Sequence, residues 1–238
     1  MLEVTKWMLG PLKSNCYLVS FRGEAIIVDP GWHEDVGIVL EEVERRRLKV
    51  KIIIATHGHF DHVSGVHIVK SILRTPFAMH QADIDIARRA HKSAYRYLGV
   101  EPPQIPEPDI LLKEGDVIEI GGIKLKILET PGHTPGSITI TGNLKAFTGD
   151  LLMEAYRALS KTYAEAVAFT GDTLFKGTIG RVDLPGSSPT QMIISLRKIA
   201  RLNPKTIVYP GHGPSTTLEE ELKNNQYLKA ALEDDKEP

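Results

Sequence analysis

Three histidines and an aspartate crowd into residues 56–62, which read Thr-His-Gly-His-Phe-Asp-His. A β-branched run at 51–55 predicts a buried strand before them, and a helical pattern begins after them. The segment is therefore a loop at a strand end, where irregular backbone lets side chains two positions apart converge on one point. Imidazole and carboxylate donors without thiolate favour zinc, iron or manganese. The sequence predicts a metal site with the donors His57, His59, Asp61 and His62.

One loop supplies too few ligands, and three other segments repeat the same arrangement of strand, glycine turn and donor. His133 lies between two Pro-Gly pairs, after the strand-like run at 123–128. Asp172 ends an apolar run through Phe-Thr-Gly, and His212 ends another through Tyr-Pro-Gly. Four strands thus deliver polar residues at their carboxyl ends, which is how a sheet collects an active site from distant parts of a chain.

Composition bounds the remaining possibilities. The chain has 238 residues, 42% of them hydrophobic and 25% charged, which is enough to form one domain over residues 1–238. A net charge of −1 implies no general attraction to nucleic acid or to a membrane surface. No secretion signal and no run of about 18 apolar residues is evident, so we expect a cytoplasmic protein. The single cysteine, Cys16, lies in a strand-like run and is expected to be buried rather than nucleophilic.

Strands and helices alternate in the expected secondary structure, which favours sheets covered by helices. We expect strands near residues 3–9, 15–20, 24–29, 51–55, 76–79, 117–120, 123–128, 137–141 and 206–209. Helices are expected near residues 34–48, 64–74, 81–98, 189–202 and 216–232.

The donor motifs occur in the order of a known family. They are Thr-His-Gly-His-Phe-Asp-His at 56–62, Thr-Pro-Gly-His-Thr-Pro-Gly-Ser at 130–137, Phe-Thr-Gly-Asp-Thr-Leu-Phe-Lys-Gly at 169–177, Gly-Arg-Val-Asp at 180–183 and Pro-Gly-His-Gly-Pro at 210–214. With them, nearly the whole chain resembles the metallo-β-lactamase superfamily, and within it the short glyoxalase II-like (hydroxyacylglutathione hydrolase-like) enzymes. This resemblance implies an αββα sandwich, with two mixed sheets face to face, helices outside and metals at one edge.

The resemblance also implies a ligand set for two divalent ions, which we expect to be zinc, with iron or manganese as alternatives. His57, His59 and His133 would hold one ion, Asp61, His62 and His212 would hold the second, and Asp172 would bridge them. Ions about 3.5 Å apart share a water and lower its pKa towards neutrality, so a bridging hydroxide would attack a thioester such as S-lactoylglutathione. Asp61 is assigned as catalytic as well as metal-binding, because its negative charge offsets that of the ions.

A repeat complicates the choice of bridging ligand, because Ala-Phe-Thr-Gly-Asp occurs at 146–150 and again at 168–172. The distance from His133 favours Asp150, whereas the residues that follow favour Asp172, which we prefer. Apolar residues at helical spacing between the copies predict an amphipathic helix over 151–167, with Asp150 as its N-cap. We therefore interpret residues 151–172 as an inserted segment that contains a helix.

Substrate choice is expected to involve Arg181, which matches the basic residue that contacts the glutathione carboxylate in the family. Asp183 departs from the aromatic residue of full-length glyoxalase II, and the Arg-x-Asp pattern is shared with persulfide dioxygenases. Those enzymes bind one iron through two histidines and an aspartate, so a mononuclear-iron dioxygenase is an alternative, as is another hydrolase of the superfamily. A β-lactamase is disfavoured because no export signal is seen and because that class commonly has other ligands at the positions of His62 and Asp172. The expected partner is a small-molecule thioester.

Overall fold

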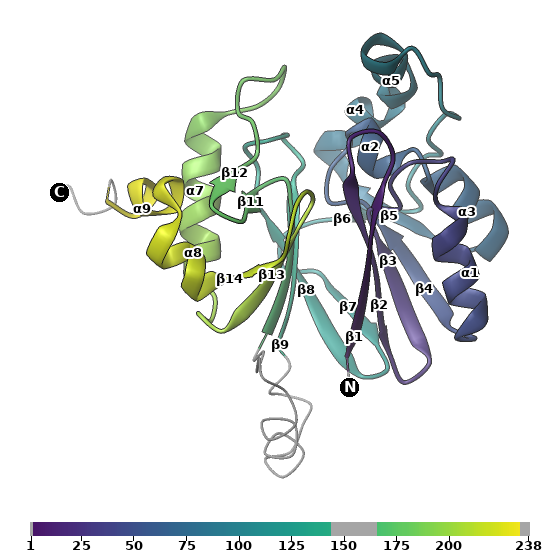
Figure 1. Ribbon diagram of the computed structural model, residues 1–238, viewed down its shortest axis with the longest axis horizontal. Coiled ribbons are helices and arrows are strands. Elements are labelled where there is room, and N and C mark those ends of the chain that lie inside the picture. The colour runs from purple at the N-terminus through teal and green to yellow at the C-terminus, as the bar shows by residue number, and fades with distance from the viewer. Residues whose placement is uncertain (1, 144–165, 234–238) are drawn as a thin grey trace.

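Two mixed six-stranded sheets form the body of the protein (Figure 1). The computed structural model describes residues 2–143 and 166–233. The strands of the first sheet, in spatial order, are β1 (Glu3–Leu9), β2 (Ser14–Phe21), β3 (Glu24–Val28), β4 (Lys49–Ile54), β5 (Phe77–His80) and β6 (Ile110–Leu112). Those of the second are β14 (Thr216–Thr217), β13 (Thr206–Pro210), β10 (Ala166–Gly171), β9 (Ile138–Asn143), β8 (Ile123–Glu129) and β7 (Val117–Ile120). A short hairpin of β11 (Leu174–Phe175) and β12 (Thr178–Ile179) follows β10.

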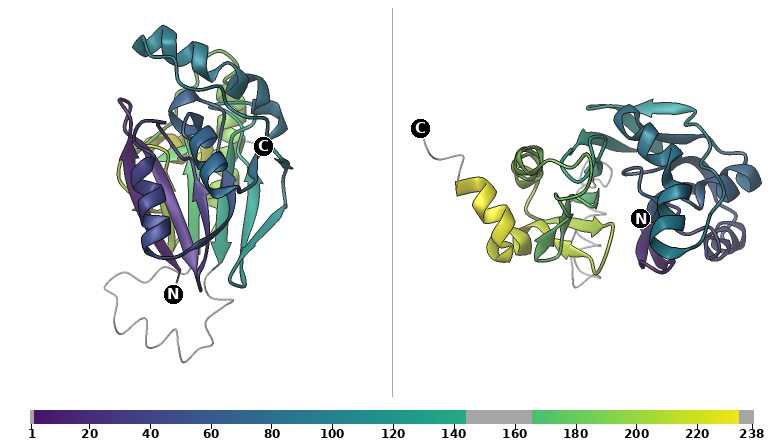
Figure 2. Two further views of the ribbon diagram at one scale, coloured as in Figure 1. Left: turned by 90° about the vertical axis from the view of Figure 1, so that its right-hand side faces the viewer. Right: turned by 90° about the horizontal axis from the view of Figure 1, so that it is seen from above.

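Helices cover the outer face of each sheet (Figure 2). On the first sheet these are α1 (Gly37–Arg45), α2 (Phe60–Val63), α3 (Val66–Leu73), a 3₁₀ turn η1 (Gln81–Asp83), α4 (Ile84–Arg88) and α5 (Ala90–Leu98). On the second they are α7 (Pro189–Ala200), α8 (Leu218–Asn224) and α9 (Gln226–Glu233). The layers are thus helix, sheet, sheet, helix, which confirms the predicted αββα sandwich.

The central strands are apolar at nearly every position because both of their faces are covered. In β2, Cys16 and Leu18 pack in the core under the helices, whereas Tyr17 and Val19 pack in the core between the two sheets. Neighbouring residues of a strand point to opposite faces, so a strand between two layers needs apolar side chains on both. Cys16 is fully buried, as expected, and burial raises the pKa of its thiol.

Strand direction brings the carboxyl ends of several strands to one edge of each sheet. β3 and β4 run parallel in the first sheet, and β10 and β13 run parallel in the second. β8 and β10 are both antiparallel to β9, so these two also run in the same direction. The two edges are joined by backbone hydrogen bonds from Ile138 N to Thr56 O (2.9 Å) and from Asn15 N to Gly211 O (2.7 Å). The polar residues that follow these strands therefore meet between the sheets.

Two predicted helices are interrupted by residues that start new elements. The helix expected over 81–98 is divided into η1, α4 and α5. The helix expected over 216–232 is divided at Asn225, whose side-chain oxygen accepts hydrogen bonds from the amides of Tyr227 (3.0 Å) and Leu228 (3.2 Å) and so caps α9. Periodicity alone does not reveal such breaks, because buried apolar residues occur on both sides of them, as at Leu218 in α8 and Leu228 in α9.

The predicted helix of the inserted segment lies almost wholly outside the described residues. Its last two residues are described, and the prediction is wrong there, since Ala166 and Val167 begin β10 rather than end a helix. β10 pairs with β9 on one side and β13 on the other, so it is an internal strand of the second sheet. The end of the segment 151–172 is thus part of the core.

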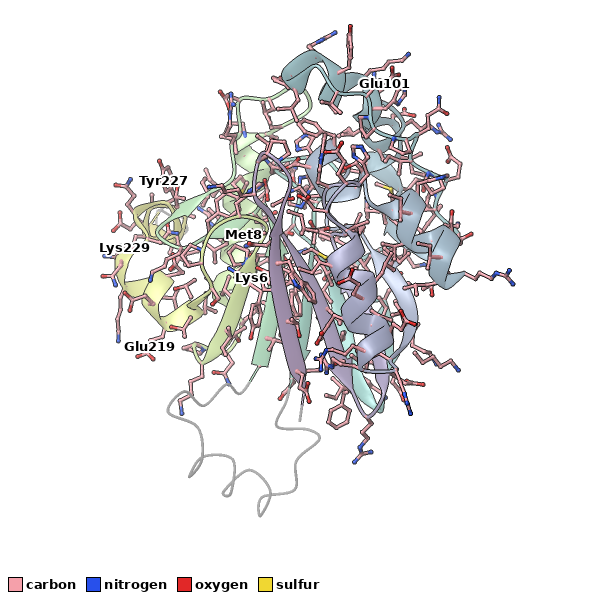
Figure 3. The ribbon with its side chains drawn as sticks, turned by 45° about the vertical axis from the view of Figure 1, so that its right-hand side comes forward. Lys6, Met8, Glu101, Glu219, Tyr227 and Lys229 are labelled. Atoms are coloured by element: carbon pink, nitrogen blue, oxygen red, sulfur yellow. The ribbon has the colours of Figure 1, made fainter. Side chains whose placement is uncertain are left out.

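None of the helices within the described part of the chain is long and apolar enough to cross a membrane. The outer helices present polar side chains outward instead: Glu219 lies on α8 and Lys229 on α9, both on the side away from the sheets (Figure 3).

Candidate metal centre

The loop after β4 supplies four of the predicted donors. His59 has an extended backbone (φ −71°, ψ 147°) at the N-cap of α2, which carries Asp61 and His62 in its single turn. The amide of His62 donates to the carbonyl of His59 (3.0 Å), which closes this turn. The tight turn folds the segment back on itself, so donors from positions 57 to 62 reach a common space.

Glycine turns carry the other three donors. Asp172 directly follows β10, whose last residue, Gly171, has a φ of +48° that other residues rarely adopt. His212 follows Gly211 at the end of β13. A Cβ at Gly211 would overlap Asp172 Oδ1 and would lie 2.9 Å from His62 Cε1. Glycine is therefore required where this turn passes the other donors.

The structure brings all seven predicted metal donors together. They form three overlapping groups, and within each group the ligand atoms lie within 4.8 Å of one another. The groups are His57 with His59 and His133, His57 with His62 and Asp172, and Asp61 with His62 and His212. The first and third groups correspond to the two ligand sets that the resemblance implies.

Asp172 occupies the space between these two sets. Its Oδ1 lies 3.5 Å from His62 Nε2, and its Oδ2 lies 3.5 Å from His133 Nε2 and 3.7 Å from His212 Nε2. The carboxylate thus faces histidines of both sets, as a bridging ligand must. Asp150, the competing residue, lies outside the described residues.

Hydrogen bonds on the far side of each ring set the orientation of the imidazoles. The Thr56 hydroxyl donates to Asp29 Oδ2 (2.7 Å), so its oxygen accepts from His57 Nδ1 (3.1 Å). His62 Nδ1 donates to the same Asp29 oxygen (3.0 Å). His133 Nδ1 donates to the backbone carbonyl of Arg181 (2.9 Å). In all three rings Nε2 is consequently directed towards the centre, where it can bind an ion.

Asp29 is a functional residue that the search for donors missed. Its carboxylate is 1% exposed and also accepts from the amide of Thr56 (2.7 Å), so it supports both His57 and His62. The signal was present in the sequence, because Ile-Ile-Val-Asp at 26–29 is another strand that ends in an acidic residue. Asp29 supports the donors from behind, because its carboxylate faces His62 Nδ1 and the Thr56 hydroxyl rather than the space that the ligand atoms share.

Burial and neighbouring charges divide the donors into two electrostatic classes. Burial and the adjacent imidazoles lower the pKa of His57, and they lower that of His59 to about 3. Burial also lowers the pKa of His62, but Asp61, Asp172 and Asp29 outweigh it and raise the pKa to about 10. The metal-free protein at neutral pH therefore has neutral imidazoles at His57 and His59 and a protonated imidazole at His62.

The donor set fits divalent ions on evidence independent of any motif. His57 Nε2 and Asp172 Oδ1 are buried polar atoms without a hydrogen-bond partner in the described part of the chain. Such atoms cost about 1–3 kcal/mol each unless another group compensates them. Both face the centre of the cluster, so a cation bound there would satisfy them. Buried imidazole and carboxylate donors without thiolate suit zinc, iron or manganese.

Arg181 lies at the surface beside this cluster rather than within it. Its side chain is 68% exposed and forms a two-pronged ion pair with Asp183 (2.9 and 3.0 Å). Its backbone carbonyl, in contrast, touches the site through His133. The side chain is thus available to a substrate while the main chain positions a ligand.

Replacing Gly211 by alanine tests the close approach of the two ligand sets. The added methyl group would overlap Asp172 Oδ1, so we expect Gly211→Ala to lose most of its bound metal, measured by elemental analysis after dialysis. Gly37→Ala is the matched control, because a Cβ there meets nothing within 4 Å. Full metal content in Gly211→Ala would contradict the arrangement.

Proton release on metal binding tests the charge of His62. Because the pKa of His62 is raised to about 10 in the metal-free protein, the ring is protonated at pH 8 and must lose its proton to become a ligand. We expect at least about one proton released per chain on loading with Zn²⁺ at pH 8, and an affinity that rises as the pH approaches 10. Calorimetry in buffers of different ionisation enthalpy measures this release. The number of protons released should be lower in His62→Gln. If the unaltered protein releases no proton, His62 is not protonated in the metal-free protein.

Comparison with known sequences identifies the family of this chain. A family model described as "Metallo-beta-lactamase superfamily" matches residues 9–160 and 163–212. A protein of Aquifex aeolicus described only as uncharacterized is 37% identical over 228 residues, covering 94% of this chain and 96% of its own. Hydroxyacylglutathione hydrolase GloC of Haemophilus influenzae is 30% identical over 227 residues, covering 92% of this chain and 94% of its own.

Solved structures show the same fold. The B3 metallo-beta-lactamase BLEG-1 superimposes with a TM-score of 0.79 at 30% identity, covering 95% of this chain and 99% of its own. TTHA1623, solved in a di-iron-bound form, superimposes with a TM-score of 0.75 at 33% identity, covering 94% and 99%. The match of the family model over most of the chain, together with the layered fold, shows that this chain belongs to the metallo-β-lactamase superfamily.

Proposed function

We propose that this chain is a dinuclear metallohydrolase that cleaves thioesters such as S-lactoylglutathione. The observation that carries this proposal is the set of seven donors in three overlapping groups. A four-coordinate zinc ion needs at most four protein ligands. Seven convergent donors, with Asp172 facing both sets, therefore support two ions rather than one.

Two divalent ions held there would supply an acidic water and a Lewis acid for the substrate carbonyl. The residues of the chain fix the donors and control access to them. His62 is fully buried, whereas the side chain of Asp61 is 11% exposed and that of His212 is 28% exposed, so Asp61 and His212 lie nearer to solvent. The catalytic role that we assign to Asp61 is its negative charge, which would offset that of the ions on the side of the centre nearer to solvent. Hydrolysis forms a bond from oxygen to the acyl carbon and breaks the carbon–sulfur bond, and a proton of the water passes to the departing thiolate.

Two comparisons support this choice of chemistry. The relative from Haemophilus influenzae is a hydroxyacylglutathione hydrolase by name and aligns over nearly the full length of both chains. The TTHA1623 structure contains two irons, which is consistent with a two-ion centre but leaves iron beside zinc as a candidate metal for this chain.

The exposed guanidinium of Arg181 supports a substrate that carries a carboxylate. Arginine binds carboxylates through two parallel hydrogen bonds, and Asp183 already holds the group in that geometry. A carboxylate of a glutathione-like substrate would replace or share this partner. We infer that Arg181 binds the thiol-carrying half of the substrate, away from the reacting carbonyl.

β-Lactam hydrolysis is a second candidate, favoured by the similarity to BLEG-1 at 30% identity over almost the whole chain. β-Lactamases commonly have other ligands at the positions of His62 and Asp172, which disfavours this reaction here, although a two-ion centre would serve both reactions. The two substrates would differ in their contacts beside the donor cluster, where a thioester whose thiol-carrying half bears a carboxylate would bind Arg181.

Metal content and substrate preference together test the proposal. We expect two ions per chain and a higher kcat/KM for S-lactoylglutathione than for nitrocefin, because the two-ion centre suits both reactions but Arg181 favours the thioester. Elemental analysis and parallel hydrolysis assays measure these quantities. A single iron with oxygen uptake on glutathione persulfide would support the dioxygenase instead, and faster nitrocefin turnover would support the β-lactamase.

Arg181→Ala separates binding from chemistry. Loss of a fixed cation outside the reacting centre should raise the KM for S-lactoylglutathione about 10-fold with little change in kcat. Arg45→Ala is the matched control, since Arg45 is equally exposed (69%) and paired with Glu42 but lies on α1. An unchanged KM in Arg181→Ala would assign Arg181 to structure alone.

A further inference from the structure

Asp83 is a buried carboxylate that no motif explains. It is the last residue of η1 and has no exposed surface. It lies outside the seven donors, yet it contacts two of the loops that carry them. Burying a carboxylate is costly unless donors surround it, so its partners indicate what it does.

Three donors from two separate loops converge on this carboxylate. The amide of Gly58 and the hydroxyl of Thr134 both donate to Oδ2, each at 2.7 Å. The amide of Gly136 donates to Oδ1 at 2.6 Å. Hydrogen bonds to a charged acceptor are short and about twice as strong as neutral ones. Asp83 therefore ties the loop after β4 to the loop after β8.

Both loops can approach Asp83 only because they contain glycine at the contact. A Cβ at Gly58 would lie 2.7 Å from the backbone oxygen of Asp83, and a Cβ at Gly136 would lie 2.7 Å from its Oδ1. Any larger residue would force the loops away from the carboxylate. The two glycines and Asp83 thus form one close-packed unit.

This unit lies beside every ligand of the three-histidine group. Gly58 separates His57 from His59, and Thr134 directly follows His133. His59 Nδ1 and His133 Nε2, which come from the two loops, lie 2.9 Å apart. An ion bound by both imidazoles would require a particular distance between these two nitrogens. That distance depends on how the two loops are held together.

We propose that Asp83 is a positioning residue that holds the two loops in register and so preorganises His57, His59 and His133 to bind an ion. The proposal rests on the metal binding of the proposed function. Asp83 contacts no ion and no substrate. It acts through the backbone of Gly58 and Gly136 and the hydroxyl of Thr134.

Asparagine at this position would preserve shape but not bonding. The amide nitrogen of asparagine is a hydrogen-bond donor. Whether this nitrogen takes the place of Oδ1 or of Oδ2, it would face an N–H or O–H group that also donates. One of the two loops would then lose its backbone hydrogen bond to residue 83. The backbone hydrogen bond from Ile138 N to Thr56 O (2.9 Å) does not involve Asp83 and continues to join the same strands. We therefore expect Asp83→Asn to fold.

The test measures affinity at the three-histidine group alone, without relying on activity. His212→Ala removes a ligand of the third group and leaves the first group intact, so it serves as a background that binds one ion. In this background Asp83→Asn should weaken Co²⁺ binding about 10- to 100-fold, as loss of a group that orients ligands does. Competition with a chelator gives the affinity, and the visible spectrum of Co²⁺ reports the geometry.

Glu221→Gln in the same background is the matched control. Glu221 is also a buried carboxylate (1% exposed) with three donors, from Gly177 N (2.7 Å), Thr216 Oγ1 (2.8 Å) and Asn225 Nδ2 (2.9 Å). It lies on α8, in the outer helical layer of the second sheet. Glu221→Gln should lower the unfolding temperature of the metal-free protein as much as Asp83→Asn does, but it should leave Co²⁺ affinity unchanged.

Thr134 offers a milder pair of variants that disturb one hydrogen bond. Thr134→Val should weaken Co²⁺ binding several-fold, and Thr134→Ser, which keeps the hydroxyl, should restore it. Unchanged affinity in both Asp83→Asn and Thr134→Val, or equal weakening in Glu221→Gln, would overturn the positioning role. Absence of any Co²⁺ binding in the His212→Ala background would instead count against the metal binding of the proposed function.

Discussion

Burial of polar donors without enough protein partners is the constraint on which the rest of this structure depends. Seven imidazole and carboxylate groups form three overlapping clusters, and two of their atoms have no hydrogen-bond partner among the described residues. Such a cluster is unfavourable by itself, because like groups repel and burial removes water. The opposing pKa shifts of His59 and His62 express the same conflict. A bound cation removes both penalties, so the site that is costly for folding is suited to binding.

The surrounding fold is organised to hold that cluster rigidly. Glycine at 58, 136 and 211 lets the loops pass at distances that a Cβ would forbid. Two fully buried carboxylates complete the support, but they act on different parts. Asp29 orients the rings of His57 and His62 through Thr56 and a direct hydrogen bond, whereas Asp83 joins the backbones of two loops. Ring orientation and loop separation are thus set by separate groups, which allows each to be tested separately.

Rigidity of the centre contrasts with the exposure of its rim. Arg181 uses its carbonyl to fix His133 and leaves its guanidinium in solvent beside Asp183. The same residue therefore links the buried donors to the protein surface. In the proposed function the donors would hold the ions, so the choice of substrate would depend on this exposed residue.

The sequence by itself determined the donors, because strand, turn and donor recur as local patterns, and it determined the layered fold, because apolar runs and family motifs occur in order. Only the tertiary structure showed how the donors divide into three groups and that Asp172 faces histidines of both the first and the third group. Asp29 and Asp83 also required the structure, since each acts on residues more than 20 positions away through hydrogen bonds that no local pattern encodes. The helix predicted to end at Val167 failed for the same reason: β10 is a strand because β9 and β13 pair with it on both sides, and pairing between distant segments outweighs local periodicity.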